Sequence, residues 1–178
     1  MTLKQFLFLV AIAALIGLLV ASGVEKWSRQ DQPASSKSQL EKLPEISLTS
    51  LDGTIWHSNK SAHKVLVLNF WATWCPPCLE EMPVFSKLQA EFAARDVAFI
   101  GIAIDDSEAV QEFVDSYGID FTILLGDTET VALSERMGNR FSALPYTVVA
   151  DKGGEIKFRH AGGIKEEQLR PVLAELSK

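Results

Sequence analysis

Two cysteines stand three positions apart, in the run Trp74-Cys75-Pro76-Pro77-Cys78, and they are the only cysteines in the chain. A pair at this spacing at the start of a helix has a specific chemical use. The helix N-terminus has unpaired N–H groups and a positive dipole end, which stabilise a thiolate at the first cysteine. In such motifs the thiol pKa falls to about 3.5–7.5, which gives a nucleophile near neutral pH. We expect reversible dithiol chemistry, with Cys75 as the attacking thiol and Cys78 as the resolving thiol.

Other uses of the two cysteines are weaker. A structural disulfide across so short a loop stabilises little, because the closure entropy of a few residues is small. A metal site needs further ligands, and the only histidines upstream are His57 and His63. Covalent haem attachment needs a histidine directly after the second cysteine, where this chain has Leu79. A copper-binding chaperone that uses the same dithiol and a histidine stays open as an alternative.

The segments around the cysteines are typical of alternating strands and helices. Residues 65–70 form a continuous apolar run of strand length, which suits a central strand buried on both faces. The helix that begins at the cysteines has apolar residues at helical spacing, and we expect Pro83 to kink it. This alternation predicts an α/β fold with a mixed sheet flanked by helices. Further strands are expected at 46–49, 54–56, 97–104, 121–125, 146–150 and 156–160, and further helices after 107, at 128–137 and around 169–176.

The ends of the helix after position 107 can be placed from capping rules. Ser107 is expected to cap its start and Gly118 to end it. Apolar residues at helical spacing predict an inner face, which is made of Val110, Phe113, Val114 and Tyr117.

The run VLVLNFWATWCPPCLEEMP, residues 65–83, resembles the active-site strand and helix of the thioredoxin superfamily. It is most similar to the membrane-anchored TlpA/ResA-type thiol–disulfide oxidoreductases. The similarity covers about residues 43–178. It includes Pro83, the 143–147 loop that carries the family's cis-proline, an N-terminal β-hairpin, and a central insertion at 105–144. The resemblance implies a thioredoxin-like fold and a redox-active Cys75–Cys78 disulfide, with no other cofactor and no metal.

The resemblance also implies a role for Glu81, which matches a glutamate typical of the TlpA/ResA branch. It lies three residues after Cys78, so both face one side of the helix, and it can accept or donate the Cys78 proton. The alternative is a solvated helix carboxylate, like its neighbour Glu80. Where thioredoxin has a buried aspartate, this chain has Asn69, which carries no proton at physiological pH.

Four residues are expected to contact the substrate. By the resemblance, a cis bond at Pro145 turns the Leu144 backbone outward, so that it can pair with an extended substrate peptide. Trp74 is expected to border the thiol as an apolar docking surface, together with Pro76. Trp71, in contrast, is expected to pack in the core.

The N-terminus predicts a membrane helix. Residues 6–24 carry no charge, and as a helix of about 28 Å they can cross a hydrocarbon core. We expect an uncleaved signal-anchor at 1–24, a flexible linker at 25–42 and the thioredoxin-like domain at 43–178. Ala21 and Gly23 leave a cleaved signal peptide open as an alternative. The charges on the two sides of the span are nearly balanced and do not decide its orientation.

Charge and resemblance together predict the kind of partner. The whole chain has a net charge of −6, and residues 43–178 hold 12 Lys and Arg against 20 Asp and Glu, which argues against nucleic-acid binding. The resemblance implies a single-pass protein of the bacterial inner membrane with its domain in the periplasm. It would reduce cysteine-containing client proteins, for example in cytochrome c maturation, and draw electrons from a membrane thiol donor. The alternative is a disulfide oxidase or isomerase.

Overall fold

The computed structural model describes residues 40–61 and 64–178. Within these residues the strands are β1 (Ser47–Ser50), β2 (Ile55–His57), β3 (Val65–Trp71), β4 (Val97–Ala103), β5 (Thr122–Leu125), β6 (Tyr146–Ala150) and β7 (Ile156–Ala161). The helices are α2 (Pro76–Phe92), α3 (Ser107–Tyr117), α4 (Thr128–Arg136) and α5 (Glu166–Leu176), with short 3-10 turns at Ser58–Ser61 and Ala93–Arg95.

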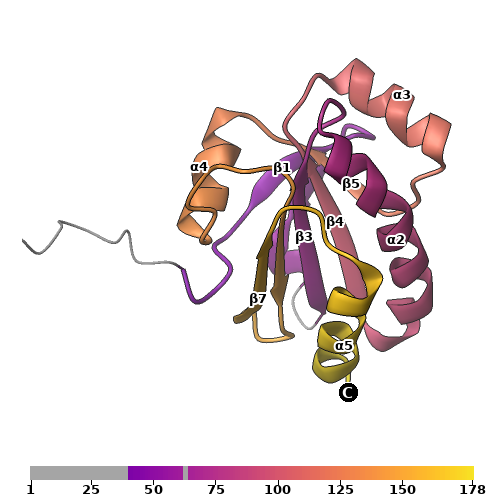
Figure 1. The fold of residues 1–178 in the computed structure, drawn as a ribbon. Helices are drawn as coiled ribbons and strands as arrows, with labels where there is room; N and C mark the ends of the chain where they lie inside the picture. The colour runs from indigo at the N-terminus through magenta and orange to yellow at the C-terminus, as the bar shows by residue number, and fades with distance from the viewer. Residues whose placement is uncertain (1–39, 62–63) are drawn as a thin grey trace, which may run out of the picture. The chain divides into compact units, whose positions relative to one another are not determined.

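All seven strands join one sheet in the order β2-β1-β5-β4-β3-β6-β7 (Figure 1). The pairs β3–β4 and β4–β5 are parallel, whereas β1–β2, β1–β5, β3–β6 and β6–β7 are antiparallel. The predicted mixed sheet and the predicted N-terminal hairpin are therefore confirmed, and β6 and β7 form a second hairpin. All residues of β3 are buried, as the continuous apolar run from Val65 predicts.

Side chains on the two faces of the sheet pack into two hydrophobic clusters. Alternate residues of β3 point to opposite faces. On one face Val67 and Trp71 pack with residues of α2, such as Phe85. On the other, Leu68 and Phe70 pack with a cluster that Leu133 of α4 joins. Helices therefore flank both faces of the sheet, and α2 lies on the face opposite to α4.

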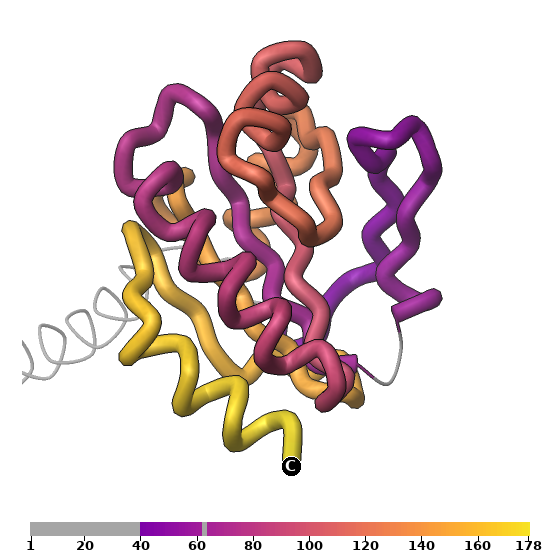
Figure 2. Tube along the Cα trace, turned by 90° about the vertical axis from the view of Figure 1, so that its right-hand side faces the viewer, coloured from indigo at the N-terminus to yellow at the C-terminus, as the bar shows by residue number. Residues whose placement is uncertain are grey.

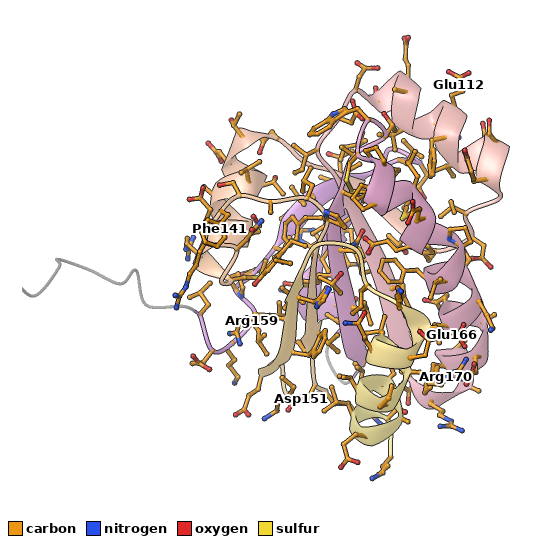
Figure 3. All side chains as sticks on the ribbon, in the orientation of Figure 1. Glu112, Phe141, Asp151, Arg159, Glu166 and Arg170 are labelled. Atoms are coloured by element: carbon orange, nitrogen blue, oxygen red, sulfur yellow. A yellow bond between two sulfur atoms is a disulfide. The ribbon has the colours of Figure 1, made fainter. Side chains whose placement is uncertain are left out.

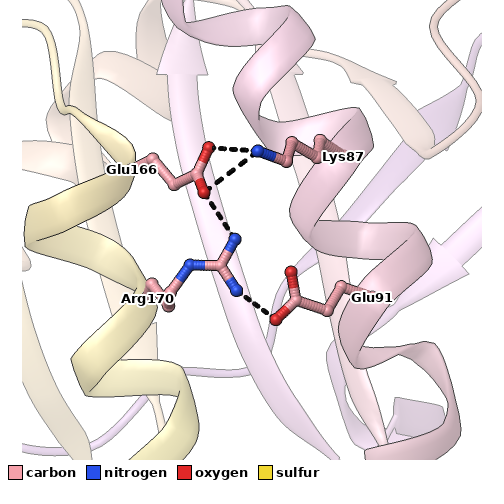
Figure 4. Close-up of polar contacts among 4 residues, drawn as sticks. All are labelled: Lys87, Glu91, Glu166 and Arg170. Atoms are coloured by element: carbon pink, nitrogen blue, oxygen red, sulfur yellow. Dashed lines mark hydrogen bonds and ion pairs between the residues drawn. The ribbon is translucent and has the colours of Figure 1, made fainter.

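Helix α5 runs beside α2 (Figures 1 and 2). Its buried residues Leu169 and Leu173 belong to the same cluster as those of α2. Ion pairs bridge the two helices at the surface (Figure 4). Glu166 accepts from Lys87 at 2.8 Å, and Arg170 pairs with both Glu91 and Glu166. Exposed pairs of this kind contribute about 0–1 kcal/mol each, so the apolar contact holds the helices together.

Helix α3 differs from the prediction at its start and on its inner face. Asp106, not Ser107, is the N-cap, because its side chain accepts from the N–H groups of Glu108 and Ala109. Gly118 ends the helix with φ 62°, as predicted. Tyr117 was expected on the inner face, but it is 56% exposed, with its ring stacked on that of Phe113.

Pro83 lies inside α2, which continues to Phe92. None of the helices in residues 40–61 and 64–178 is long and apolar enough to cross a membrane. The predicted membrane helix and most of the predicted linker lie in residues 1–39, outside the described residues, as does His63.

Candidate active site

Cys75 and Cys78 form a disulfide at the start of α2, with their Cα atoms 5.3 Å apart. Cys75 is the N-cap residue, in an extended conformation with φ −101° and ψ 100°, and the two following prolines occupy the first helical positions. Cys78 is fully buried, and Cys75 is 4% exposed. The prolines have no N–H, so the nearest helical donor is the N–H of Cys78, which donates to the Cys75 carbonyl at 3.0 Å. Any stabilisation of a Cys75 thiolate would then come mainly from the helix dipole.

The loop between β3 and the disulfide is held by Asp105, just beyond the end of β4. The N–H and the hydroxyl of Thr73 both donate to Asp105 Oδ2, at 2.9 and 2.5 Å. The other oxygen, Oδ1, accepts from the N–H of Asp106 at 2.8 Å. These donors hold the pKa of Asp105 below its usual value although burial opposes them. The carboxylate thus connects the loop before Cys75 to the end of the neighbouring strand.

Glu81 is buried in the sheet-facing side of α2, with 2% exposure. Its two oxygens accept from Asn69 Nδ2 at 2.7 Å and from the N–H of Ile164 at 2.9 Å. Burial raises the pKa of Glu81 to about 7, while the two donors act to lower it. The alternative of a solvated carboxylate is wrong for Glu81, although the neighbouring Glu80 is exposed.

Asn69 connects Glu81 to the next strand. Its side-chain NH₂ group donates to Glu81 and also to Thr147 Oγ1 at 3.2 Å, across the β3–β6 pair. Its oxygen Oδ1 is buried and has no hydrogen-bond partner among the described residues. Asn69 therefore acts on Glu81 as a hydrogen-bond donor.

A groove of about 360 Å³ lies along the outer side of Glu81, between α2 and the segment that leads into α5. It places the buried carboxylate next to an opening to solvent. The lining residues are Pro77, Glu80, Glu81, Val84, Gly163, Ile164, Lys165, Glu166 and Glu167.

The peptide bond between Leu144 and Pro145 is cis, as the resemblance implies. The Pro145 carbonyl accepts from the N–H of Gly162 at 2.8 Å. Because β6 begins directly after Pro145 and its Tyr146 pairs with Phe70 near the end of β3, this loop and the cysteines lie at the same end of the sheet.

Trp71 and Trp74 differ in exposure as predicted. Trp71 is fully buried, whereas Trp74, directly before Cys75, is 66% exposed. Pro76 is exposed as well, and Leu144 is half-buried. The structure thus brings Trp74 and Pro76 to the edge of the disulfide, with Leu144 on the loop at the same end of the sheet.

Metal ligation is not evident in residues 40–61 and 64–178, where no group of three or more His, Cys, Asp or Glu side chains could hold an ion. His57 ends β2, which is separated from β3 by three strands of the sheet. It therefore does not lie beside the cysteines.

Two features near the site were missed by the sequence analysis. Asp105 contacts Thr73 across 32 positions, and the only signal was an acidic residue directly after a buried strand. Asn139 is 2% exposed and binds both the N–H and the carbonyl of Ala143 at 2.9 Å, which fastens the loop before the cis-proline. An asparagine directly after a helix-ending glycine was the signal there.

A protein-family model described as Redoxin matches residues 39–176. The thiol-disulfide oxidoreductase ResA of Halalkalibacterium halodurans is 33% identical over 171 residues, which is 96% of this chain and 94% of ResA. The thioredoxin-like protein YneN of Bacillus subtilis is 29% identical over 175 residues, with 96% and 98% covered. A solved structure of a secreted thiol-disulfide isomerase from Corynebacterium glutamicum aligns with a TM-score of 0.70 and 26% identity, covering 76% of this chain and 84% of that one. The region matched by the family model contains both cysteines and every strand of the described sheet.

Proposed function

We propose that this chain, which belongs to the Redoxin family and is a TlpA/ResA-type thiol–disulfide oxidoreductase, reduces disulfide bonds of client proteins through Cys75 and Cys78. The observation that carries the proposal is the disulfide at the first turn of α2, with Glu81 buried one turn further along. The pair can exist as a disulfide or as two thiols, and the groove beside Glu81 connects the proton-accepting group to solvent.

The first step begins with the reduced pair. The Cys75 thiolate, at the positive end of the α2 dipole, attacks one sulfur of the client disulfide. A bond forms between Cys75 Sγ and that sulfur while the client disulfide breaks. The second client sulfur leaves as a thiolate and takes a proton from water. The product is a mixed disulfide between the chain and its client.

The second step resolves the mixed disulfide. The Cys78 thiol gives its proton to Glu81, and its sulfur attacks Cys75 Sγ. The Cys75–Cys78 disulfide forms, and the client's remaining sulfur leaves as a thiolate, which is protonated from solvent. Two electrons pass from the cysteine pair to the client, so a dithiol donor must reduce the pair again. A pKa of about 7 at Glu81 suits this exchange near neutral pH.

The client would bind at the cis-proline loop. The Leu144 backbone, next to the cis bond, would pair with an extended client segment whose sulfur reaches Cys75. Trp74, which is 66% exposed, and the exposed ring of Pro76 would cover the segment beside the disulfide.

The proposed location is the outer face of the bacterial inner membrane. Support comes from the uncharged run at residues 6–24 and from the similarity to ResA and to a secreted isomerase. There the clients would be cysteine-containing proteins, with apocytochromes c among them, and the electrons would come from a membrane thiol donor.

Cysteine variants test the order of attack. In Cys78→Ser the first step can occur and the second cannot, so we expect stable mixed disulfides with insulin in vitro and with clients in living cells. Cys75→Ser lacks the nucleophile and should neither reduce insulin nor trap it. Equal trapping by the two variants would contradict the proposed order.

The similarity to a secreted thiol-disulfide isomerase supports a second candidate, in which the pair works as an oxidant or isomerase. The reduction potential separates the two. A value nearer −270 than −120 mV would favour the reductant, and a value nearer −120 mV would favour the oxidant.

A further inference from the structure

Phe141 is held out in solvent although it is one of the most apolar residues in its segment. Its side chain is 87% exposed, compared with 62% for Ile55, 66% for Trp74 and 56% for Tyr117, the other exposed large hydrophobic residues of the described chain. Figure 3 places it on the loop beside α4. An exposed ring contributes no burial to folding, so the fold does not depend on its aromatic character.

The loop that carries Phe141 is fastened on both sides of the ring. Before the ring, the Asn139 side chain donates to Ser134 Oγ in α4 at 3.1 Å. After the ring, the same side chain binds both backbone groups of Ala143 at 2.9 Å, and the N–H of Ser142 donates to the Asn139 carbonyl at 3.2 Å. A loop tied in this way presents the ring at low conformational cost, which is what a binding residue needs.

The loop continues directly into the proposed client-binding backbone. Phe141 precedes Leu144 by three residues, so their Cα atoms are at most about 11 Å apart. An extended client segment rises about 3.3 Å per residue, and it therefore reaches Phe141 within about three or four positions of its residue that pairs with Leu144. Trp74, the other strongly exposed aromatic side chain, lies directly before Cys75 at the same end of the sheet.

We propose that Phe141 is a specificity-determining residue, which binds an apolar side chain of the client a few positions from the reactive cysteine. This inference rests on the proposed function, since it uses the same client segment. The partner it fits is an extended, cysteine-containing segment with a Leu-like or aromatic side chain three to five residues from the sulfur. Aromatic residues, Phe among them, are enriched at protein interfaces.

The test uses the full-length chain and two disulfide-linked peptides that differ at one position. One peptide has Leu four residues from its cysteine, and the other has Ser there. Phe141→Ala should lower kcat/KM for the Leu peptide on the order of tenfold, mainly through KM, and the Ser peptide much less. Phe141→Tyr should restore most of the preference for Leu. Ile55→Ala, at an apolar residue that is 62% exposed on the far edge strand β2, is the control and should leave both peptides unchanged.

Other results would overturn the inference. An equal loss for both peptides would indicate general damage to the loop, and no loss would remove Phe141 from client binding. If the wild type self-associates through Phe141 and the variant becomes monomeric with unchanged peptide kinetics, the ring binds a second copy instead. Hydroxyethyl disulfide, which is too small to reach Phe141, reports on the cysteine pair alone, and exchange is measured in both directions. A wild type that only oxidises would therefore contradict the proposed reductant. The preference for the Leu peptide over the Ser peptide can still be measured in that case.

Discussion

At the scale of single residues, Glu81 is the group on which the proposed mechanism depends most. The carboxylate is buried, yet two donors, Asn69 and the N–H of Ile164, keep it close to balance between its charged and neutral forms. Because its pKa is raised to about 7, a small energy moves its proton in either direction. In the proposed mechanism Asn69, at the position of thioredoxin's aspartate, would support a proton carrier on the helix rather than carry the proton itself.

Glu81→Gln should slow the resolving step and remove its inflection near pH 7, because the amide cannot accept the Cys78 proton. General base catalysis of this kind is typically worth about 10²–10⁴-fold. The measurement is stopped-flow exchange with a mixed disulfide from pH 5 to 9. Glu80→Gln, one position away and exposed, is the matched control and should match the wild type. If Glu81→Gln also matches it across this range, water accepts the proton.

Glu81 should also make stability depend on pH. The unfolded carboxyl titrates near 4.5 and the folded one near 7, so between these values the folded state holds the proton that the unfolded state has released. Stability contributed by the neutral form is therefore lost as pH rises from 4.5 to 7. Relative to Glu81→Gln, the wild type should lose about 3 kcal/mol of unfolding free energy between pH 4 and pH 8. Urea unfolding of the oxidised forms measures it, and parallel curves for the two proteins would contradict it.

At the scale of elements, the loop before the cysteines depends on a contact from the neighbouring strand. Asp105, just beyond β4, binds Thr73, just beyond β3, so the ends of two parallel strands are fastened together above the sheet. The loop is therefore positioned in part by a residue that the strand order brings beside it.

Asp105→Ala should release the Thr73 amide. Losing one hydrogen bond of about 1–1.5 kcal/mol predicts roughly tenfold faster hydrogen exchange at Thr73. Asp106→Ala is the matched control, since its side chain caps α3 and accepts from Glu108 and Ala109 instead. That variant should speed exchange at Glu108 and leave Thr73 unchanged. Unaltered exchange at Thr73 in Asp105→Ala would show that the contact does not hold the loop.

Packing between β4 and its neighbours is tight at Gly101. A Cβ there would lie 2.7 Å from Ile123 Cδ1 and 3.0 Å from Trp71 Nε1. Gly101→Ala should therefore lower the unfolding free energy by about 1–3 kcal/mol, as overpacking does. In Gly153→Ala the nearest atom is Asp151 Oδ1 at 3.3 Å, in the exposed β6–β7 turn, and we expect a change within about 1 kcal/mol. Thermal unfolding measures the stability of the two variants, and equal stability would contradict the packing argument.

At the scale of the whole molecule, the sequence predicted the order of strands and helices because each carries its own pattern. Residues 65–70 are apolar except for Asn69, and β3 is buried on both faces. The two cysteines and the cis-proline followed from a local motif and its resemblance. The sequence did not decide between neighbouring residues, and it did not reveal contacts between residues far apart in the chain. Asp106 and Ser107 are both good caps, and only the folded backbone decides between them. The contact of Asp105 with Thr73 exists only after the strands have paired.

The membrane topology is a prediction for the whole chain. If residues 6–24 anchor it with the cysteines outside, a periplasmic alkaline phosphatase fused after Lys178 should be active, and a cytoplasmic reporter at the same point should be silent. The control is the same fusion to a chain without residues 1–24, which should lose phosphatase activity. An inactive phosphatase on the full chain would place the cysteines in the cytoplasm, and it would contradict the proposal that the clients are periplasmic proteins.

Residues 40–43, which precede β1, form hydrogen bonds to the sheet. Arg159 donates to the Leu40 carbonyl at 2.6 Å, the N–H of Ile156 to Glu41 at 2.8 Å, and the N–H of Leu43 to Gly154 at 2.8 Å. These bonds lie on β7 and its turn, whereas the disulfide lies at the end of the sheet where β6 begins. Mechanical tension that reaches the domain along the preceding chain therefore meets the bonds of Leu40 first, one from Arg159 of β7 and one from the Leu40 N–H to Arg136 at the end of α4.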